Sequence, residues 1–148
     1  MAKPALHDAT VRASIENRIR SLTPDTRGRW GKMSVDQMLW HCSQAIASAM
    51  GEIPAETIFV PLPASVVKFM VLNLPWIKGA PTAPGFVATQ QYNFDEQRQR
   101  LLDLLARFAA RPLDSGWAPH PAFGNVTGLE YSQLQAKHFN HHLTQFGV

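Results

Sequence analysis

The sequence is poor in the residues that mark several common classes of protein. Its 148 residues include one cysteine, Cys42, so no disulfide can form within the chain and a disulfide-stapled secreted domain is excluded. Charged residues make up only 17%, and the net charge of +3 is scattered rather than gathered into a basic stripe. Because nucleic-acid-binding domains normally carry such a stripe, we expect no nucleic-acid partner.

Long apolar runs are also missing. The richest segment, residues 58–77, is interrupted by Pro61, Pro63 and Pro75, and its longest proline-free stretch has 11 residues. A bilayer-spanning helix needs about 20, so this segment predicts a buried helix or a subunit interface. The first residues lack the apolar core of a signal peptide. We therefore expect a cytoplasmic protein that does not bind membranes.

The residues that are present follow a helical pattern. Apolar side chains recur at helical spacing, and no stretch alternates with the period of two that marks a strand. Capping boxes at Ser34–Gln37 and Thr127–Glu130 mark two helix starts. The expected helices span residues 7–22, 34–49, 64–74, 93–110 and 127–146. The pattern predicts an all-α fold, a four-helix bundle with one short extra helix and long irregular connections at 76–91 and 113–126, in a single domain over residues 1–148.

Histidine is the most informative residue type, with six in the chain. His138 and His142 lie four residues apart, which on a helix places them ~6 Å apart along the axis and ~40° around it. Tyr131 and Leu134 mark the same helix face as the inward one. His41 shares a helix face with apolar neighbours and should also point inward. Two readings stay open at this point: hydrogen-bonded core histidines, or a metal site built across two helices.

Three segments carry a resemblance to a known family. They are Trp30-Gly-Lys-Met-Ser-Val-Asp-Gln-Met38, His120-Pro-Ala-Phe-Gly124 and Lys137-His-Phe-Asn-His-His-Leu-Thr-Gln-Phe-Gly147. With these motifs the sequence resembles an uncharacterised branch of the DinB-like superfamily of small metal-binding four-helix bundles. The resemblance implies His41, His138 and His142 as metal ligands. Leu143-Thr144 stands where that superfamily often has Arg-Gly, so the substrates of better-known members are not carried over.

Other residues are assigned supporting roles around that site. Ligating histidines hold their second ring nitrogen against a further partner, and the candidates are Gln145, Gln37, Tyr131 and the additional histidine His141. His120, in an irregular segment, is the candidate catalytic acid or base; a purely structural turn is the other interpretation.

Several further side chains carry simple expectations. His7 should be a surface residue of the first helical turn. Cys42 should be a buried, unreactive thiol. Trp76 and Trp117, in the two long connections, are the tryptophans most expected to line a pocket. Lys78 could contact an anionic substrate, although a solvated lysine is the default.

Two functions from different classes follow. Characterised DinB-like proteins include thiol-dependent transferases and isomerases, so the resemblance implies a metal-dependent enzyme, a transferase or a hydrolase. It would use a divalent transition metal, zinc or nickel first, and a small-molecule substrate or low-molecular-weight thiol, and would form a homodimer. The alternative is a non-catalytic helical bundle that binds an apolar ligand or a protein partner, with the histidines structural or vestigial.

Overall fold

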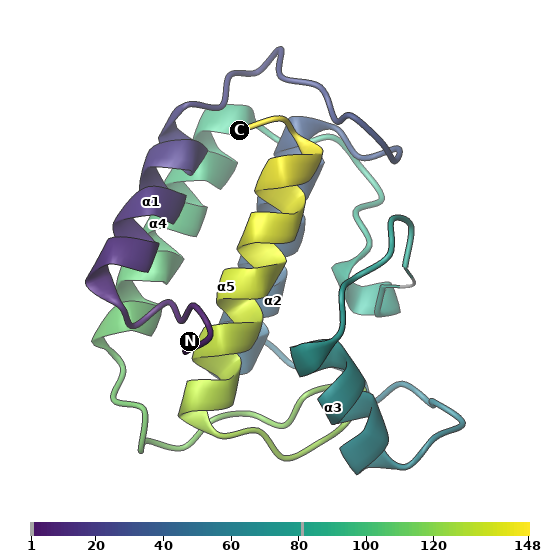
Figure 1. The fold of residues 1–148 in the computed structure, drawn as a ribbon. Coiled ribbons are helices and arrows are strands. Elements are labelled where there is room, and N and C mark those ends of the chain that lie inside the picture. The colour runs from purple at the N-terminus through teal and green to yellow at the C-terminus, as the bar shows by residue number, and fades with distance from the viewer. Residues whose placement is uncertain (1, 81) are drawn as a thin grey trace.

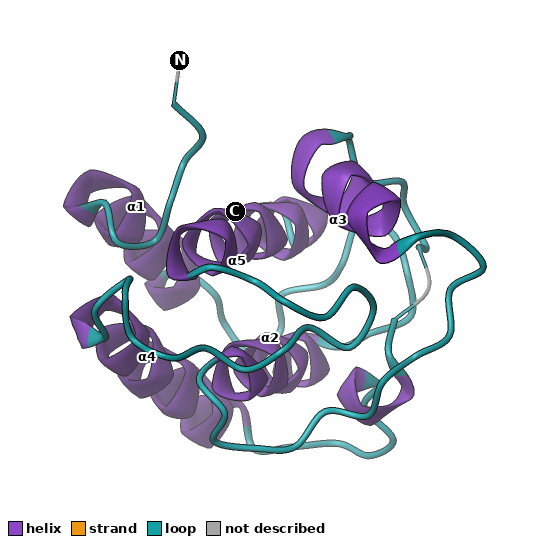
Figure 2. Ribbon diagram, turned by 90° about the horizontal axis from the view of Figure 1, so that it is seen from below, coloured by secondary structure: helices purple, strands orange, loops and turns teal. Residues whose placement is uncertain are grey.

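The computed structural model describes residues 2–80 and 82–148, and within these residues it is all-helical, with no strand (Figures 1 and 2). Five α-helices and one 3₁₀ turn follow the chain in the order α1 (Ala9–Arg20), α2 (Val35–Ala49), α3 (Ala64–Asn73), η1 (Pro84–Phe86), α4 (Phe94–Ala110) and α5 (Gly128–Gln145). The expected all-α class and the five helical segments are confirmed. The short 3₁₀ turn inside the connection 76–91 was not expected.

Four helices enclose the core, and one lies outside it. α2 packs against α4 and α5, and α1 packs against the same two helices. Seen from below, the ends of these four helices surround the interior, whereas α3 lies to one side, next to α5 (Figure 2). The largest fully buried side chains include Phe108 of α4, Phe139 of α5 and Leu39 of α2. The apolar stripes predicted from the periodicity are therefore the ones that meet in the core.

The helix ends follow their capping residues. Gln37 accepts the backbone N–H of Ser34 at 3.0 Å, and Thr127 and Glu130 exchange reciprocal hydrogen bonds of 3.1 Å at the start of α5. α1 begins later than expected because Asp8 caps it, accepting two backbone N–H groups of the first turn. Side chains thus satisfy backbone donors that no helical carbonyl can reach.

His7 corrects a sequence-based expectation, because it is not a free surface residue. Its Nδ1 lies 2.9 Å from Ser132 Oγ and its Nε2 lies 2.8 Å from the carbonyl oxygen of Arg111. The ring also packs against Phe108 and Trp117. These partners come from α4, α5 and the connection between them, so only the folded chain creates this environment for His7.

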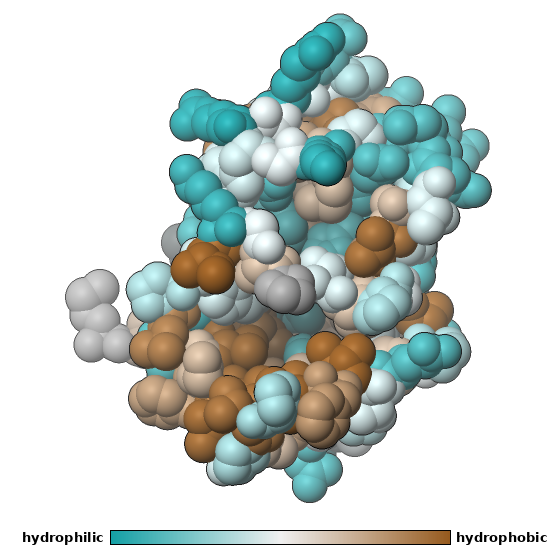
Figure 3. Space-filling model, turned by 90° about the vertical axis from the view of Figure 1, so that its right-hand side faces the viewer, coloured by the Kyte–Doolittle hydropathy of each residue, from teal (hydrophilic) through white to brown (hydrophobic). Residues whose placement is uncertain are grey.

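α3 differs from the other helices because it buries little of its apolar surface. Only Val67 of α3 is buried, while Phe59, Ile77 and Phe69 are 89%, 73% and 60% exposed. Apolar residues gather over the lower part of the face shown in Figure 3, where α3 lies. We call this the α3 apolar face, made of Phe59, Leu62, Val66, Phe69, Met70, Leu74 and Ile77. No helix among the described residues has the length and apolar character needed to cross a membrane.

The first prediction concerns the start of α5. A Cβ added at Gly128 would overlap the Leu113 carbonyl oxygen and lie 2.6 Å from Trp117 Nε1. Alanine is favoured over glycine in a helix by about 0.5–1 kcal/mol, so propensity alone predicts that Gly128→Ala stabilises the protein. We expect the opposite, a loss of about 1–3 kcal/mol from overpacking, measured as a lower urea midpoint.

Gly116→Ala is the matched control for this prediction. A Cβ at Gly116 meets no described atom within 4 Å, so its urea midpoint should stay near that of the wild type. If Gly128→Ala were as stable as the wild type or more so, the close approach at this helix start would not constrain the fold.

Candidate metal centre

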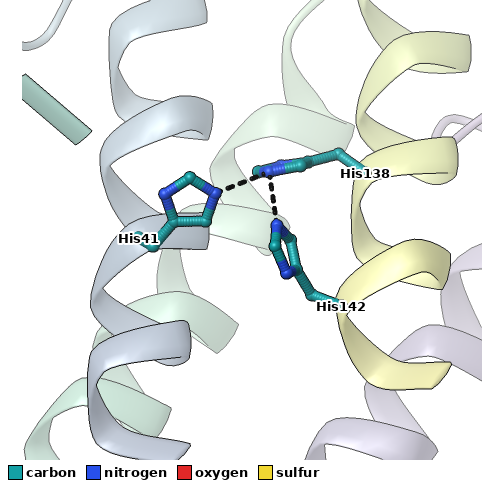
Figure 4. A group of neighbouring side chains, drawn as sticks. All are labelled: His41, His138 and His142. Carbon is teal, nitrogen blue, oxygen red and sulfur yellow. Dashed lines mark hydrogen bonds between the residues drawn. The ribbon is translucent and has the colours of Figure 1, made fainter. Parts of the chain in front are cut away.

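Two helices bring three histidines together in the interior. α2 carries His41, and α5 carries His138 and His142 one turn apart, so the three rings converge from facing helices (Figure 4). They are only 5%, 9% and 9% exposed. One nitrogen of each ring lies within 4.8 Å of the other two. The expected inward orientation of all three histidines is confirmed.

The nitrogens that face one another are the three Nε2 atoms. His138 Nε2 lies 2.9 Å from His41 Nε2 and 3.1 Å from His142 Nε2 (Figure 4). Two nitrogens bound to a tetrahedral zinc ion at about 2.0–2.1 Å lie about 3.3–3.4 Å apart. These two separations are thus a few tenths of an ångström below the values that a shared ion would set.

The outer ring nitrogens of two histidines are held by oxygen atoms. His41 Nδ1 lies 2.8 Å from the carbonyl oxygen of Phe86, and His142 Nδ1 lies 2.8 Å from Gln145 Oε1. The Gln145 amide is oriented by its own Nε2, which donates to the carbonyl oxygen of Trp30 at 3.0 Å. Because both oxygens can only accept, each Nδ1 carries the proton and each Nε2 presents its lone pair to the centre.

His138 completes a donor set that hydrogen bonds alone cannot satisfy. Its Nε2 faces two lone pairs, and a single N–H can serve only one of them well. Its Nδ1 is buried and has no hydrogen-bond partner among residues 2–80 and 82–148. An ion at the centre would not give this Nδ1 a partner either, so only the Nε2 atoms bear on metal binding. A cation at the centre would engage all three Nε2 lone pairs, so the residues present fit a divalent metal ion.

Burial keeps these histidines neutral. It is the main cause that lowers the pKa of His41, of His138 and of His142, the last to about 3. The neighbouring imidazoles lower the pKa of His138 further. An unfolded histidine titrates near ~6.5, so the unfolded chain takes up protons first as the pH falls. Protonation of the unfolded chain therefore lowers the free energy of unfolding progressively as the pH falls from about 6.5 towards the folded-state pKa values, and has no effect at clearly higher pH.

Gln145 connects the centre to the loop between α1 and α2. Besides its side-chain bonds, its carbonyl oxygen accepts the backbone N–H of Arg29 at 2.6 Å. Gly31 has φ +79°, and a Cβ there would lie 2.7 Å from Gln145 Nε2. A glycine is thus required both by the backbone conformation and by the close approach. Gln145, one of the predicted supporting residues, contacts His142, whereas no sequence pattern indicated Gly31 or the Trp30 carbonyl oxygen.

Two residues predicted to support the histidines are occupied elsewhere. Gln37 closes the N-terminal cap of α2, and its Nε2 donates to the carbonyl oxygen of Gln90 at 3.0 Å. The Tyr131 hydroxyl donates to the carbonyl oxygen of Ala118 at 2.7 Å. The partner of His41 is instead the backbone carbonyl oxygen of Phe86. A pattern of side chains cannot predict such a backbone contact.

His120 lies outside the three-histidine cluster, in the connection before α5. It exchanges backbone hydrogen bonds with Gly124, and its ring stacks on Phe123 with centroids 4.0 Å apart. His120 Nδ1 accepts the backbone N–H of Ala122 at 3.0 Å, so the proton of the neutral ring resides on Nε2. Burial lowers the pKa of His120 to about 4. His120 therefore lies in a turn, and its ring also presents an N–H donor.

His141 flanks the cluster without joining it. Its ring contacts the edges of three others, with centroids 5.0 Å from His142, 5.6 Å from Trp76 and 5.9 Å from Trp30. Trp76 lines a pocket, as expected, and so does Trp30, which was not expected to. Trp117 packs instead between Phe108 and Tyr131.

Cys42 is buried, as expected. Its thiol lies 3.8 Å from Met38 Sδ, and burial raises its pKa far above the usual range. A thiol that stays protonated is neither a nucleophile nor a metal ligand. Cys42 is therefore part of the core, one residue away from the cluster but on a different face of α2.

The fold and the centre define a helical protein with a buried three-histidine cluster shared by two helices. Its sequence matches the family described as "Protein of unknown function (DUF1569)" over residues 4–147, and the chain belongs to this family. Neither a curated protein nor a solved structure matches the chain.

The second prediction concerns the protonation of the cluster. In metal-free protein at pH 7, His41 and His142 should both be neutral with the proton on Nδ1, because oxygen atoms accept from that nitrogen in each ring. Long-range ¹H–¹⁵N correlation spectra of the imidazoles distinguish this tautomer from the Nε2–H form and from imidazolium. An Nε2–H tautomer at either residue would contradict the arrangement of three converging lone pairs.

Proposed function

We propose that this protein is a metal-dependent enzyme in which the Nε2 atoms of His41, His138 and His142 hold one divalent ion. The observation that carries the proposal is the convergence of these three atoms in a buried site, with two of the rings held as Nδ1–H tautomers by Phe86 and Gln145. Preset tautomers of this kind are typical of metal-ligating histidines.

The arrangement of the helices supports the finer fold assignment. α1, α2, α4 and α5 pack pairwise around one core, as in a four-helix bundle. One histidine comes from α2 and an i, i+4 pair comes from α5, which is the pattern implied by the resemblance to DinB-like proteins. We therefore propose that the family of this chain is a branch of that superfamily and that the chain folds as one domain.

Three protein ligands favour a catalytic role over a structural one. Structural zinc sites are closed by four protein ligands, whereas catalytic sites keep a position open. An all-imidazole donor set suits zinc or nickel. A divalent ion held there supplies Lewis acidity, which favours the deprotonated form of a bound thiol or water and polarises a carbonyl group. The two reaction classes that this chemistry supports are thiol-dependent transfer and hydrolysis of a small molecule.

The chain's own residues position this chemistry. Gln145 of α5, which is itself held by the Trp30 carbonyl oxygen, fixes the ring of His142. The Phe86 carbonyl oxygen fixes the ring of His41. His120 is the candidate hydrogen-bond donor to a bound substrate, through Nε2–H, because its Nδ1 is already an acceptor and burial keeps the ring neutral. Trp76 packs against His138 with centroids 5.8 Å apart and limits the access of water on that side.

The third prediction is the metal content of purified, untagged protein. We expect about one ion per chain by elemental mass spectrometry, and its loss in His138→Ala, because the remaining two imidazoles leave the ion weakly held. Protein stripped with a chelator and reloaded with zinc or nickel should recover the same stoichiometry.

His141→Ala is the matched control for the metal content. It removes an imidazole next to His142 that lies outside the cluster, so the bound metal should remain near the wild-type level. Protein that holds no metal even after incubation with zinc and nickel, and that is equally stable with a chelator, would contradict the proposal and favour the non-catalytic alternative.

The fourth prediction separates the two reaction classes. In cobalt-substituted protein, a low-molecular-weight thiol that binds the ion as thiolate should produce a sulfur-to-cobalt charge-transfer band in the near ultraviolet. The band should be absent with the corresponding alcohol and absent in His138→Ala. A cobalt-loaded protein without such a band would contradict thiol-dependent transfer and leave hydrolysis as the proposed reaction.

The α3 apolar face favours a second candidate function. Exposed apolar surface of this extent marks sites that bind another molecule. A non-catalytic protein could use it to bind an apolar ligand or a protein partner, with the histidines structural or vestigial. A homodimer formed through the same face, which we also propose, is compatible with either function because the face is separate from the cluster.

A further inference from the structure

Of two hollows on the described part of the molecule, one adjoins the histidine cluster. The larger, of about 480 Å³, lies between α4 and the end of α2 and shares no residue with the cluster. Its wall includes Glu52 and Arg107, which are already paired at 2.6 Å. The smaller, of about 210 Å³, lies on the flank of α5 beside the cluster. The smaller hollow is therefore the one relevant to the metal centre.

We call the smaller hollow the Trp30–Trp76 pocket. It is lined by Trp30, Trp76, Lys137, Asn140, His141 and Thr144. Two indole rings from loops far apart in the sequence supply flat apolar surface, and α5 supplies the polar groups. No acidic residue lines it.

The polar groups of this pocket include hydrogen-bond donors, and positively charged side chains lie nearby. The Lys78 ammonium lies 4.4 Å from the centroid of the Trp30 ring, and the Lys137 ammonium lies 5.1 Å from that of Trp76. Lys137 donates to two backbone carbonyls at the end of α3, which leaves one of its three N–H groups. Arg18 occupies the Asn140 side-chain oxygen at 2.9 Å, so the amide –NH₂ is the free end of that side chain.

The size of the pocket limits its ligand. A volume of about 210 Å³ is below the range of about 300–1,000 Å³ that is usual for drug-sized ligands. A single ring or short chain with one charged group fits this space. Donors and ammonium groups without a carboxylate among them favour an anion, and the indole rings favour a flat apolar body.

The pocket lies directly beside the proposed metal. Two of its lining residues contact the cluster. The ring centroid of His141 lies 5.0 Å from that of His142, and the ring centroid of Trp76 lies 5.8 Å from that of His138. A molecule bound there is separated from the cluster by a single layer of side chains.

We propose that the Trp30–Trp76 pocket binds the carboxylate and the flat apolar body of a small anionic substrate next to the three-histidine centre. Its assignment to a substrate rests on the proposed function. The preference for an anion rests only on the residues of the pocket. The anion preference and the assignment to a substrate are tested separately.

The fifth prediction tests that preference with three ring compounds of similar shape. Benzoate, benzamide and benzylamine are titrated into metal-free protein, and binding is followed by tryptophan fluorescence and by amide NMR shifts. We expect saturable binding of benzoate, weaker binding of benzamide and none of benzylamine. Lys78→Met should weaken benzoate binding about two- to fivefold, as expected for a solvent-exposed ion pair, and Trp30→Leu should remove it.

Lys32→Met is the matched control, because Lys32 is an exposed lysine of the loop that carries Trp30, whereas the ammonium of Lys78 lies over the Trp30 ring of the pocket. It should bind benzoate like the wild type. If Trp30→Leu fails to fold, as judged by circular dichroism, the benzoate affinities of Lys78→Met and Lys32→Met still test the proposed pocket. Equal affinity for benzoate and benzamide, an absence of benzoate binding, or equal loss in both lysine variants would overturn the proposal.

Zinc-loaded wild type and His138→Ala separate this proposal from the proposed function. Benzoate that binds His138→Ala as it binds the wild type supports the pocket as a site independent of the ion. Benzoate that binds only the zinc-loaded wild type would show coordination to the metal and would overturn the pocket. Benzoate binding to a protein that takes up no zinc or nickel would support the anion site, whereas the proposed enzyme function would then be wrong.

Discussion

The convergence of three imidazole lone pairs inside the protein is the constraint on which the candidate site depends. Hydrogen bonds from Nδ1 to Phe86 and Gln145 fix two of the rings, and His138 meets both. A neutral cluster of this kind cannot satisfy all of its nitrogens by hydrogen bonding alone. Three buried Nε2 atoms this close together form a donor set that fits a divalent cation.

The segments outside the core act as supports for that centre. The loop before α2 reaches α5 through Gln145, and Gly31 allows the backbone to come close enough to do so. The connection after α3 supplies Trp76 against His138 and the Phe86 carbonyl oxygen against His41. The irregular parts of the chain thus complete the surroundings of the histidines and form the Trp30–Trp76 pocket, whereas the long helices provide the rigid frame.

Two surfaces of the molecule differ in character. The Trp30–Trp76 pocket is small, has positively charged side chains around it and lies next to the cluster. The α3 apolar face is broad and lies on a helix that buries only Val67. Lys137 joins the two regions, because it lines the pocket and also binds the last carbonyls of α3.

The sequence by itself determined the helices, their inward faces and the three histidines that meet. Helical periodicity encodes which side chains share a face, and capping residues encode where helices begin, so both are local properties. Only the tertiary structure decided what surrounds those histidines. The Phe86 carbonyl oxygen, the approach of Gly31 to Gln145, the enclosure of His7 and the other engagements of Gln37 and Tyr131 depend on chain segments that are distant in sequence. A backbone carbonyl belongs to every residue, so no pattern of side chains can reveal which carbonyl the folded chain brings to a histidine.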